Sequence, residues 1–182
     1  GLCNVPEVFV FQDCKAPSVS SMVGLWDDYY KVEREYGNPR TYEIAAAWLR
    51  GYGLVEDWGC GTCWSKRLEL YEEYRGVDGS GSFADVRADL RKYRSRVPCI
   101  LMRHVLEHNL DWRKILGNAL HSFRKRMVLL LFMRPEEKER ILYWQDGIPY
   151  IFLPQGELAK MLRPYLVETR IAGDEICFLL EK

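Results

Sequence analysis

The chain has 182 residues, enough for one domain with a substantial core, and 48% of them are hydrophobic while 29% are charged. Its 26 lysines and arginines balance its 26 aspartates and glutamates, so no overall field draws it to nucleic acid or to a membrane surface. No apolar run approaches the roughly 20 residues that a membrane-spanning helix needs. We therefore expect a protein outside the membrane, for which nucleic acid is not indicated as a partner, although a local basic groove stays open.

Cysteines are spread widely along the chain. They are Cys3, Cys14, Cys60, Cys63, Cys99 and Cys177. This scatter, in a chain large enough for its own core, differs from the dense framework of a small secreted scaffold. We expect buried or free thiols in a reducing compartment, and hence a cytoplasmic protein.

Taken in chain order, the predicted elements begin after an irregular stretch over residues 1 to about 22. Two helices follow, at about 26–36 and from the N-cap candidate Thr41 to Gly51, and residues 1–50 are predicted to form a helical cap. Beyond them strands and helices alternate. The predicted strands are 54–57, 74–78, 83–88, 99–102 and 127–132, the helices are 64–71, 110–123 and 154–162, and a closing hairpin joins 166–171 to 175–180.

This alternation predicts a mostly parallel sheet with helices on both faces and a ligand at the carboxyl ends of its strands. We expect a single domain over residues 1–182, with 51–182 as the ligand-binding core. The connection 133–154 mixes charged and aromatic residues, as a substrate lid would.

A glycine turn follows the first strand of this core. Gly59 and Gly61 stand where a side chain would collide with a ligand lying over the turn. Asp78 ends the next strand, where a carboxylate can bind both hydroxyls of a ribose. Trp64 occupies the position at which a dinucleotide-binding turn requires its third glycine, which argues against NAD and FAD. A different nucleoside-containing ligand is therefore indicated.

Four motifs occur in an order that resembles a known family. They are Val55–Gly61, Gly76–Asp78, Arg87–Leu90 and Met102–His108. Over about residues 50–182 the chain resembles a class I, Rossmann-like S-adenosylmethionine-dependent methyltransferase, of the group with leucine-glutamate-histidine after strand four. The resemblance implies an α/β, three-layer fold with a mostly parallel seven-stranded sheet and a C-terminal antiparallel hairpin. It also implies S-adenosylmethionine as cofactor and S-adenosylhomocysteine as product.

The resemblance assigns residues to parts of the cofactor. The glycine turn would lie under the methionine part, Asp78 would hold the ribose, and Asp89 with Leu90 would contact adenine. The cofactor-binding set is Asp57, Gly59, Cys60, Gly61, Asp78, Gly79, Asp89, Leu90, Arg103 and His104. The chain departs from the family pattern at Cys63, which replaces the third glycine of the first motif, and at Gly79, which replaces a bulky apolar residue.

Methyl transfer from a sulfonium is a direct displacement, so the protein mainly has to align nucleophile and methyl group. An oxygen nucleophile also needs a base, and His104 is the predicted one. Tyr30, Glu107 and Trp144 are the candidates for substrate contact. The acceptor is unidentified, and the lack of an inserted recognition domain favours a small molecule slightly.

Three alternative functions could be assigned to the same residues. The chain could bind S-adenosylmethionine without turnover, as a partner subunit or sensor. Cys60 and Cys63 form a C-x-x-C at a strand-to-helix junction, as in thioredoxin-like redox proteins. His104 and His108 match an H-x-x-E-H zinc motif if they share a helical face, but a third ligand is not evident, and no metal is predicted.

Overall fold

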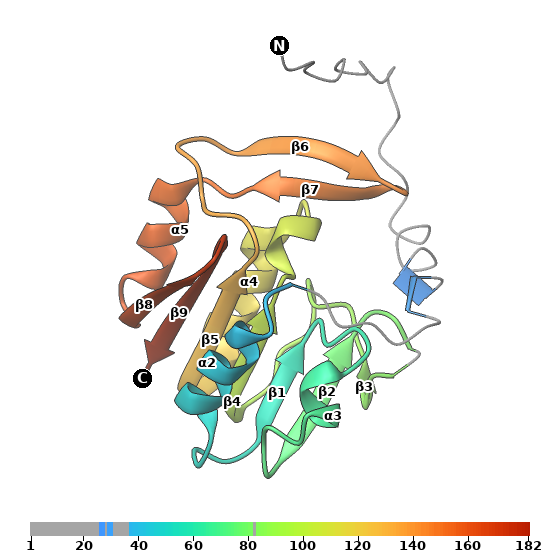
Figure 1. The fold of residues 1–182 in the computed structure, drawn as a ribbon, viewed down its shortest axis with the longest axis vertical. Coiled ribbons are helices and arrows are strands. Elements are labelled where there is room, and N and C mark those ends of the chain that lie inside the picture. The colour runs from blue at the N-terminus through green and yellow to red at the C-terminus, as the bar shows by residue number, and fades with distance from the viewer. Residues whose placement is uncertain (1–25, 28, 31–36, 82) are drawn as a thin grey trace, which may run out of the picture.

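The computed structural model describes residues 26–27, 29–30, 37–81 and 83–182 (Figure 1). The strands in this part are β1 (Val55–Trp58), β2 (Tyr74–Asp78), β3 (Val86–Arg87), β4 (Val97–Arg103), β5 (Phe123–Leu131), β6 (Arg140–Gln145), β7 (Ile148–Phe152), β8 (Leu166–Ala172) and β9 (Glu175–Glu181). The helices are α2 (Arg40–Leu49), α3 (Trp64–Arg67), the 3-10 helix η1 (Leu106–His108), α4 (Trp112–Ser122) and α5 (Gln155–Leu162).

Seven of these strands form one sheet in the order β3-β2-β1-β4-β5-β9-β8. β1 pairs in parallel with β2 and β4, and β4 pairs in parallel with β5. β9 is antiparallel to both of its neighbours, β5 and β8. The mostly parallel seven-stranded sheet and the closing hairpin are therefore confirmed.

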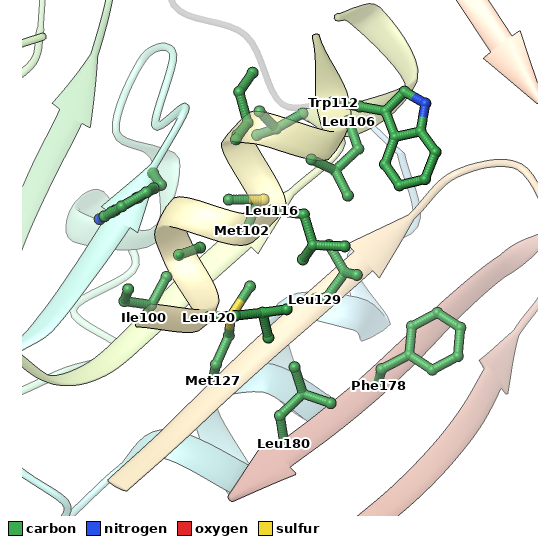
Figure 2. Packing of buried hydrophobic residues seen from close by; sticks show 14 of the residues in the cluster. Ile100, Met102, Leu106, Trp112, Leu116, Leu120, Met127, Leu129, Phe178 and Leu180 are labelled. Atoms are coloured by element: carbon green, nitrogen blue, oxygen red, sulfur yellow. The ribbon is translucent and has the colours of Figure 1, made fainter. Parts of the chain in front are cut away.

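Helices cover both faces of the sheet because its central strands are apolar on both sides. On one face, α4 packs Trp112, Leu116 and Leu120 against alternate residues of β4, β5 and β9 (Figure 2). On the other face, Trp48 and Leu49 of α2 join a second core cluster with the intervening strand residues. The three-layer architecture follows from this alternation, and it leaves the carboxyl ends of β1, β2 and β4 together at one edge.

Some boundaries differ from the sequence prediction. α2 begins at Arg40, and the hydroxyl of Thr41 donates to the carbonyl of Asn38 instead of capping the helix. α3 ends at Arg67, because Glu69 adopts a left-handed φ of 49° that a helix does not tolerate. The helix predicted over 26–36 lies largely outside the described residues.

The largest difference is in the predicted lid. Residues 133–154 were expected to be a connection, and they contain the antiparallel pair β6–β7, joined at a turn where Asp146 and Gly147 both have positive φ. This hairpin crosses beyond the carboxyl edge of the main sheet (Figure 1). The strands escaped prediction because all six residues of β6 are exposed, so no apolar alternation marks it.

Within the described part of the chain, no helix is long and apolar enough to cross a membrane. Four of the six cysteines lie there, and Cys60, Cys63, Cys99 and Cys177 are buried free thiols, as expected.

Candidate functional site

The turn after β1 is shaped by close contact with the loop after β4. Gly59 has a φ of +76°, and a Cβ at this position would lie 2.4 Å from Cγ2 of Val105. Gly61 also has a positive φ, 53°, and its amide points toward β2. A side chain at Gly59 would collide with Val105, and a positive φ favours glycine at both positions.

Asp78 connects this turn to the loop after β2. Its Oδ2 accepts a hydrogen bond from the Gly61 amide at 2.9 Å, and its Oδ1 accepts one from the Ser80 amide at 2.8 Å. Burial raises the pKa of Asp78 above its ordinary value, although the amide of Gly61 opposes that shift. A buried carboxylate is thus fixed at the edge where the sequence predicted a ribose.

Cys63, the departure from the family pattern, is accommodated by a glycine in the neighbouring strand. Cys63 has a left-handed φ of 54°, and its Sγ lies 3.3 Å from Sγ of Cys60. A Cβ on Gly76 would lie 2.6 Å from the sulfur of Cys63 and 2.9 Å from that of Cys60. Gly76 therefore provides the space for both thiols.

Replacing Gly76 by alanine should destabilise the protein by about 1–3 kcal/mol, because the added methyl overpacks the two sulfurs. The measurement is the free energy of unfolding in urea. The double variant Gly76→Ala/Cys63→Gly should recover part of the loss, since it removes the closer sulfur. Gly117→Ala, where the methyl meets no atom within 4 Å, is the control, and equal effects at 76 and 117 would refute this packing argument.

Asp57 lies in β1, the neighbour of the strand that ends at Asp78, and only 5% of its surface is exposed. Burial raises its pKa to about 7, and the hydroxyl of Tyr74, which donates to Oδ2 at 2.8 Å, opposes the shift. The carboxyl group is thus held by β2 behind the glycine turn.

A buried polar cluster stands at the end of β4. Arg103 donates to the hydroxyls of Thr41 and Tyr42 at 3.1 Å each, and its guanidinium lies 3.5 Å from a carboxylate oxygen of Glu175 in β9. The same oxygen, Oε2, lies 3.0 Å from Nε2 of His104. Glu175 thereby anchors two predicted cofactor residues, and its other oxygen accepts from the Asn38 amide at 2.5 Å.

His104, the predicted base, is therefore turned toward Glu175 through Nε2. It has a φ of 55° at the end of β4, whereas His108 lies in η1. The two histidines do not share a helical face, so the premise of the zinc motif is wrong. In the described part of the chain, no three His, Cys, Asp or Glu side chains are grouped to hold a metal ion.

A cavity opens beside the glycine turn and under the β6–β7 hairpin. Its lining comes from the turn, the end of β4, η1, the hairpin and the N-terminal segment. The residues are Trp26, Tyr29, Tyr30, Gly59, Arg103, His104, His108, Gln145, Asp146, Ile148 and Tyr150. The cavity thus brings the predicted substrate residue Tyr30 together with Gly59, Arg103 and His104.

Other predicted residues lie outside this lining. Glu107 is fully buried, and its Oε1 accepts from the Phe132 amide at 2.6 Å, so substrate contact by Glu107 stays a prediction. Trp144 lies in β6 and does not line the cavity. Asp89 is paired with Arg91 at 2.6 Å, and the Leu90 side chain packs in the main core. Adenine contacts by Asp89 and Leu90 stay predictions, as does a role for Gly79.

Glu107 should make the stability of the folded protein depend on pH. Burial raises its pKa to about 8. The folded state therefore keeps a proton that the unfolded chain releases above about pH 4.3, so stability should fall as the pH rises toward 8, by up to about 1.4 kcal/mol per pH unit.

Glu107→Gln retains an oxygen for the Phe132 amide and cannot ionise. Urea unfolding between pH 5 and 8 should show a much weaker pH slope in this variant. The remaining slope should then reflect the raised pKa of Asp57 and the lowered pKa of His108, which act in opposite directions between about pH 5 and 6.5. An unchanged slope would show that Glu107 does not hold the proton.

Sequence reasoning missed two contributors. Glu175 carried no signal, since it is one acid at the start of a C-terminal strand. Tyr150 lies in the unpredicted hairpin. His108 belongs to the Met102–His108 motif, and the structure places it in the cavity lining.

Comparison with solved structures identifies the fold as that of S-adenosylmethionine-dependent methyltransferases. The 1,6-didemethyltoxoflavin-N1-methyltransferase of Burkholderia thailandensis, solved with 1,6-didemethyltoxoflavin and S-adenosylhomocysteine, aligns with a TM-score of 0.68 at 17% identity over 90% of this chain and 86% of that one. The magnesium protoporphyrin IX methyltransferase of Synechocystis PCC 6803, solved with bound S-adenosylhomocysteine, aligns with a TM-score of 0.61 at 14% identity over 90% of this chain and 95% of that one.

A third similar structure is the complex of the Haloferax volcanii Trm112 methyltransferase activator with a methyltransferase. It gives a TM-score of 0.66 at 13% identity over 90% of this chain and 97% of that one. No protein-family model and no curated protein matches the sequence. The fold is therefore that of the methyltransferases and not of a thioredoxin-like protein.

Proposed function

We propose that the protein is an S-adenosylmethionine-dependent methyltransferase acting on a small-molecule acceptor in the cytoplasm. The observation that carries this proposal is the contact of the Gly61 amide with Asp78 at 2.9 Å, which joins the glycine turn of β1 to a buried acid at the end of β2. In this fold that edge of the sheet is where nucleoside ligands bind. The similar structures from Burkholderia thailandensis and Synechocystis, whose descriptions name bound S-adenosylhomocysteine, support the choice of cofactor.

The residues present fit that cofactor. Gly59 and Gly61 leave a turn without side chains, on which the methionine part would lie, and Asp78 offers carboxylate oxygens to ribose hydroxyls. The bound cofactor supplies an electrophilic methyl group. The chain's own residues would position it, with Arg103 and His104 beside the cavity and Glu175 3.5 Å and 3.0 Å from them. Water exclusion would fall to the β6–β7 hairpin and to Trp26, Tyr29 and Tyr30, which line the same cavity.

The alternative is a protein that binds this cofactor without turnover. The enzyme and the binding protein would both bind the cofactor. Isothermal titration calorimetry with S-adenosylmethionine and S-adenosylhomocysteine tests this binding, and we expect both ligands to bind. The absence of measurable binding would refute the proposal. Transfer of a radiolabelled methyl group to small molecules, RNA and proteins then separates an enzyme from a binding protein.

A further inference from the structure

His108 is packed into the wall of the cavity by aromatic rings. Its imidazole stacks on Phe132, with ring centroids 5.1 Å apart and an interplanar angle of 23°. Tyr150 contacts it edge-on at 4.6 Å, and Trp26 contacts it at 5.6 Å and 66°. Three separate elements therefore fix the orientation of this ring.

The hydrogen bond of His108 to the hairpin determines which nitrogen carries the proton. Nδ1 lies 3.1 Å from the carbonyl oxygen of Pro149, which can only accept, so Nδ1 carries the hydrogen. Burial lowers the pKa of His108 to about 4, so the ring is neutral at pH 7. Nε2 then has a lone pair, and among the described residues no hydrogen bond is made to it.

The remaining cavity wall combines aromatic rings with the polar residues Gln145 and Asp146, and the rings favour a flat ligand. Trp26, Tyr29 and Tyr30 contact one another ring to ring on one side, and Tyr150 stacks on Tyr143 at 4.3 Å on the hairpin side. Aromatic surfaces bind planar rings by stacking and edge contacts. The cationic lining residue, Arg103, already pairs with Glu175, so a strongly anionic ligand is not favoured.

We propose that the methyl acceptor is a small molecule with a planar aromatic or heteroaromatic ring that bears an O–H or N–H group, and that Nε2 of His108 accepts a hydrogen bond from this group. The inference rests on the proposed function and adds the substrate class. In the transfer, the acceptor atom forms a bond to the methyl carbon while the sulfur retains the electron pair of the broken S–C bond. The acceptor's proton passes to Nε2 and then to solvent.

A weak base is sufficient for this step. As the new bond forms, the acceptor's O–H or N–H group becomes far more acidic than in the free molecule, so a neutral imidazole of low basicity can take the proton late in the reaction. The geometry assigns this role to His108 and leaves His104, whose Nε2 faces Glu175, as a positioning residue.

The test is calorimetric binding to the protein saturated with S-adenosylhomocysteine, using four probes. 2-Naphthol has the ring and the O–H, naphthalene has the ring alone, decahydro-2-naphthol has the O–H on a saturated skeleton, and tetramethylammonium is a cation that aromatic cages bind. We expect 2-naphthol to bind most tightly. In His108→Phe, which keeps an aromatic ring and removes the acceptor nitrogen, its affinity should fall about tenfold, the value of one hydrogen bond.

Control measurements distinguish a loss of acceptor binding from a loss of folding or of cofactor binding. His108→Phe should retain its affinity for S-adenosylhomocysteine, His108→Gln should recover part of the 2-naphthol affinity, and His121→Phe, at an exposed site on α4, should change nothing. The inference is overturned if decahydro-2-naphthol or tetramethylammonium binds as tightly as 2-naphthol, if no probe binds, or if His108→Phe binds 2-naphthol normally. Failure of S-adenosylhomocysteine itself to bind refutes the proposed function instead.

Discussion

Asp78→Ala should weaken the binding of S-adenosylhomocysteine by about 100-fold or more. Each charge-assisted hydrogen bond from a carboxylate to a hydroxyl contributes about 1.5–3 kcal/mol, and a ribose offers two hydroxyls. The substitution also releases the Gly61 and Ser80 amides that Asp78 holds at 2.9 and 2.8 Å. Calorimetric titration of the folded variant measures the effect.

Two variants separate these contributions. Asp78→Asn keeps an oxygen for one amide and should still lose most of the affinity, because the amide group carries no charge. Asp85→Asn is the control, because Asp85 also accepts from a backbone amide, that of Gly76 at 2.8 Å, but lies outside the proposed site. This variant should bind S-adenosylhomocysteine with nearly the affinity of the wild type. An Asp78→Ala protein that binds normally would remove Asp78 from the ribose site.

The fold could be predicted from the sequence wherever burial determines the hydrophobic pattern of a segment. The central strands β4 and β5 are apolar on both faces, and the glycine turn and Asp78 belong to a short sequence pattern over residues 57–78. These features depend on short stretches of chain, so they could be predicted before the structure was known.

The features that escaped prediction depend on contacts between distant segments. Glu175 lies 71 positions after His104, and nothing near either residue indicates that they meet at 3.0 Å. β6 is exposed along its whole length, so its pairing with β7 has no hydrophobic signature. The role proposed for His108 depends in the same way on the carbonyl of Pro149, 41 positions further along the chain.

Glu175→Gln should lower the free energy of unfolding by about 3–5 kcal/mol, the usual cost of removing one partner from a buried ion pair. Glu175 and Arg103 are 5% and 8% exposed, so the substitution removes a buried carboxylate that faces the guanidinium. Gly37 packs directly against this pair, because a Cβ there would lie 2.3 Å from Oε1 of Glu175 and 2.5 Å from Nη2 of Arg103. Urea unfolding at pH 7 measures the loss.

The pH dependence of that loss identifies its cause. Burial alone would raise the pKa of Glu175, but the contacts with His104, the Asn38 amide and Arg103 lower it below its ordinary value. An acid with a lowered pKa stabilises the folded state above its unfolded pKa and loses that effect as the pH falls through the folded value, so the difference between wild type and Glu175→Gln should shrink as the pH falls below about 4.3. Glu168→Gln, which alters an exposed pair with Arg170 at 2.6 Å, should cost less than about 1 kcal/mol. A Glu175→Gln protein as stable as that control would mean that the charge of Arg103 is compensated elsewhere.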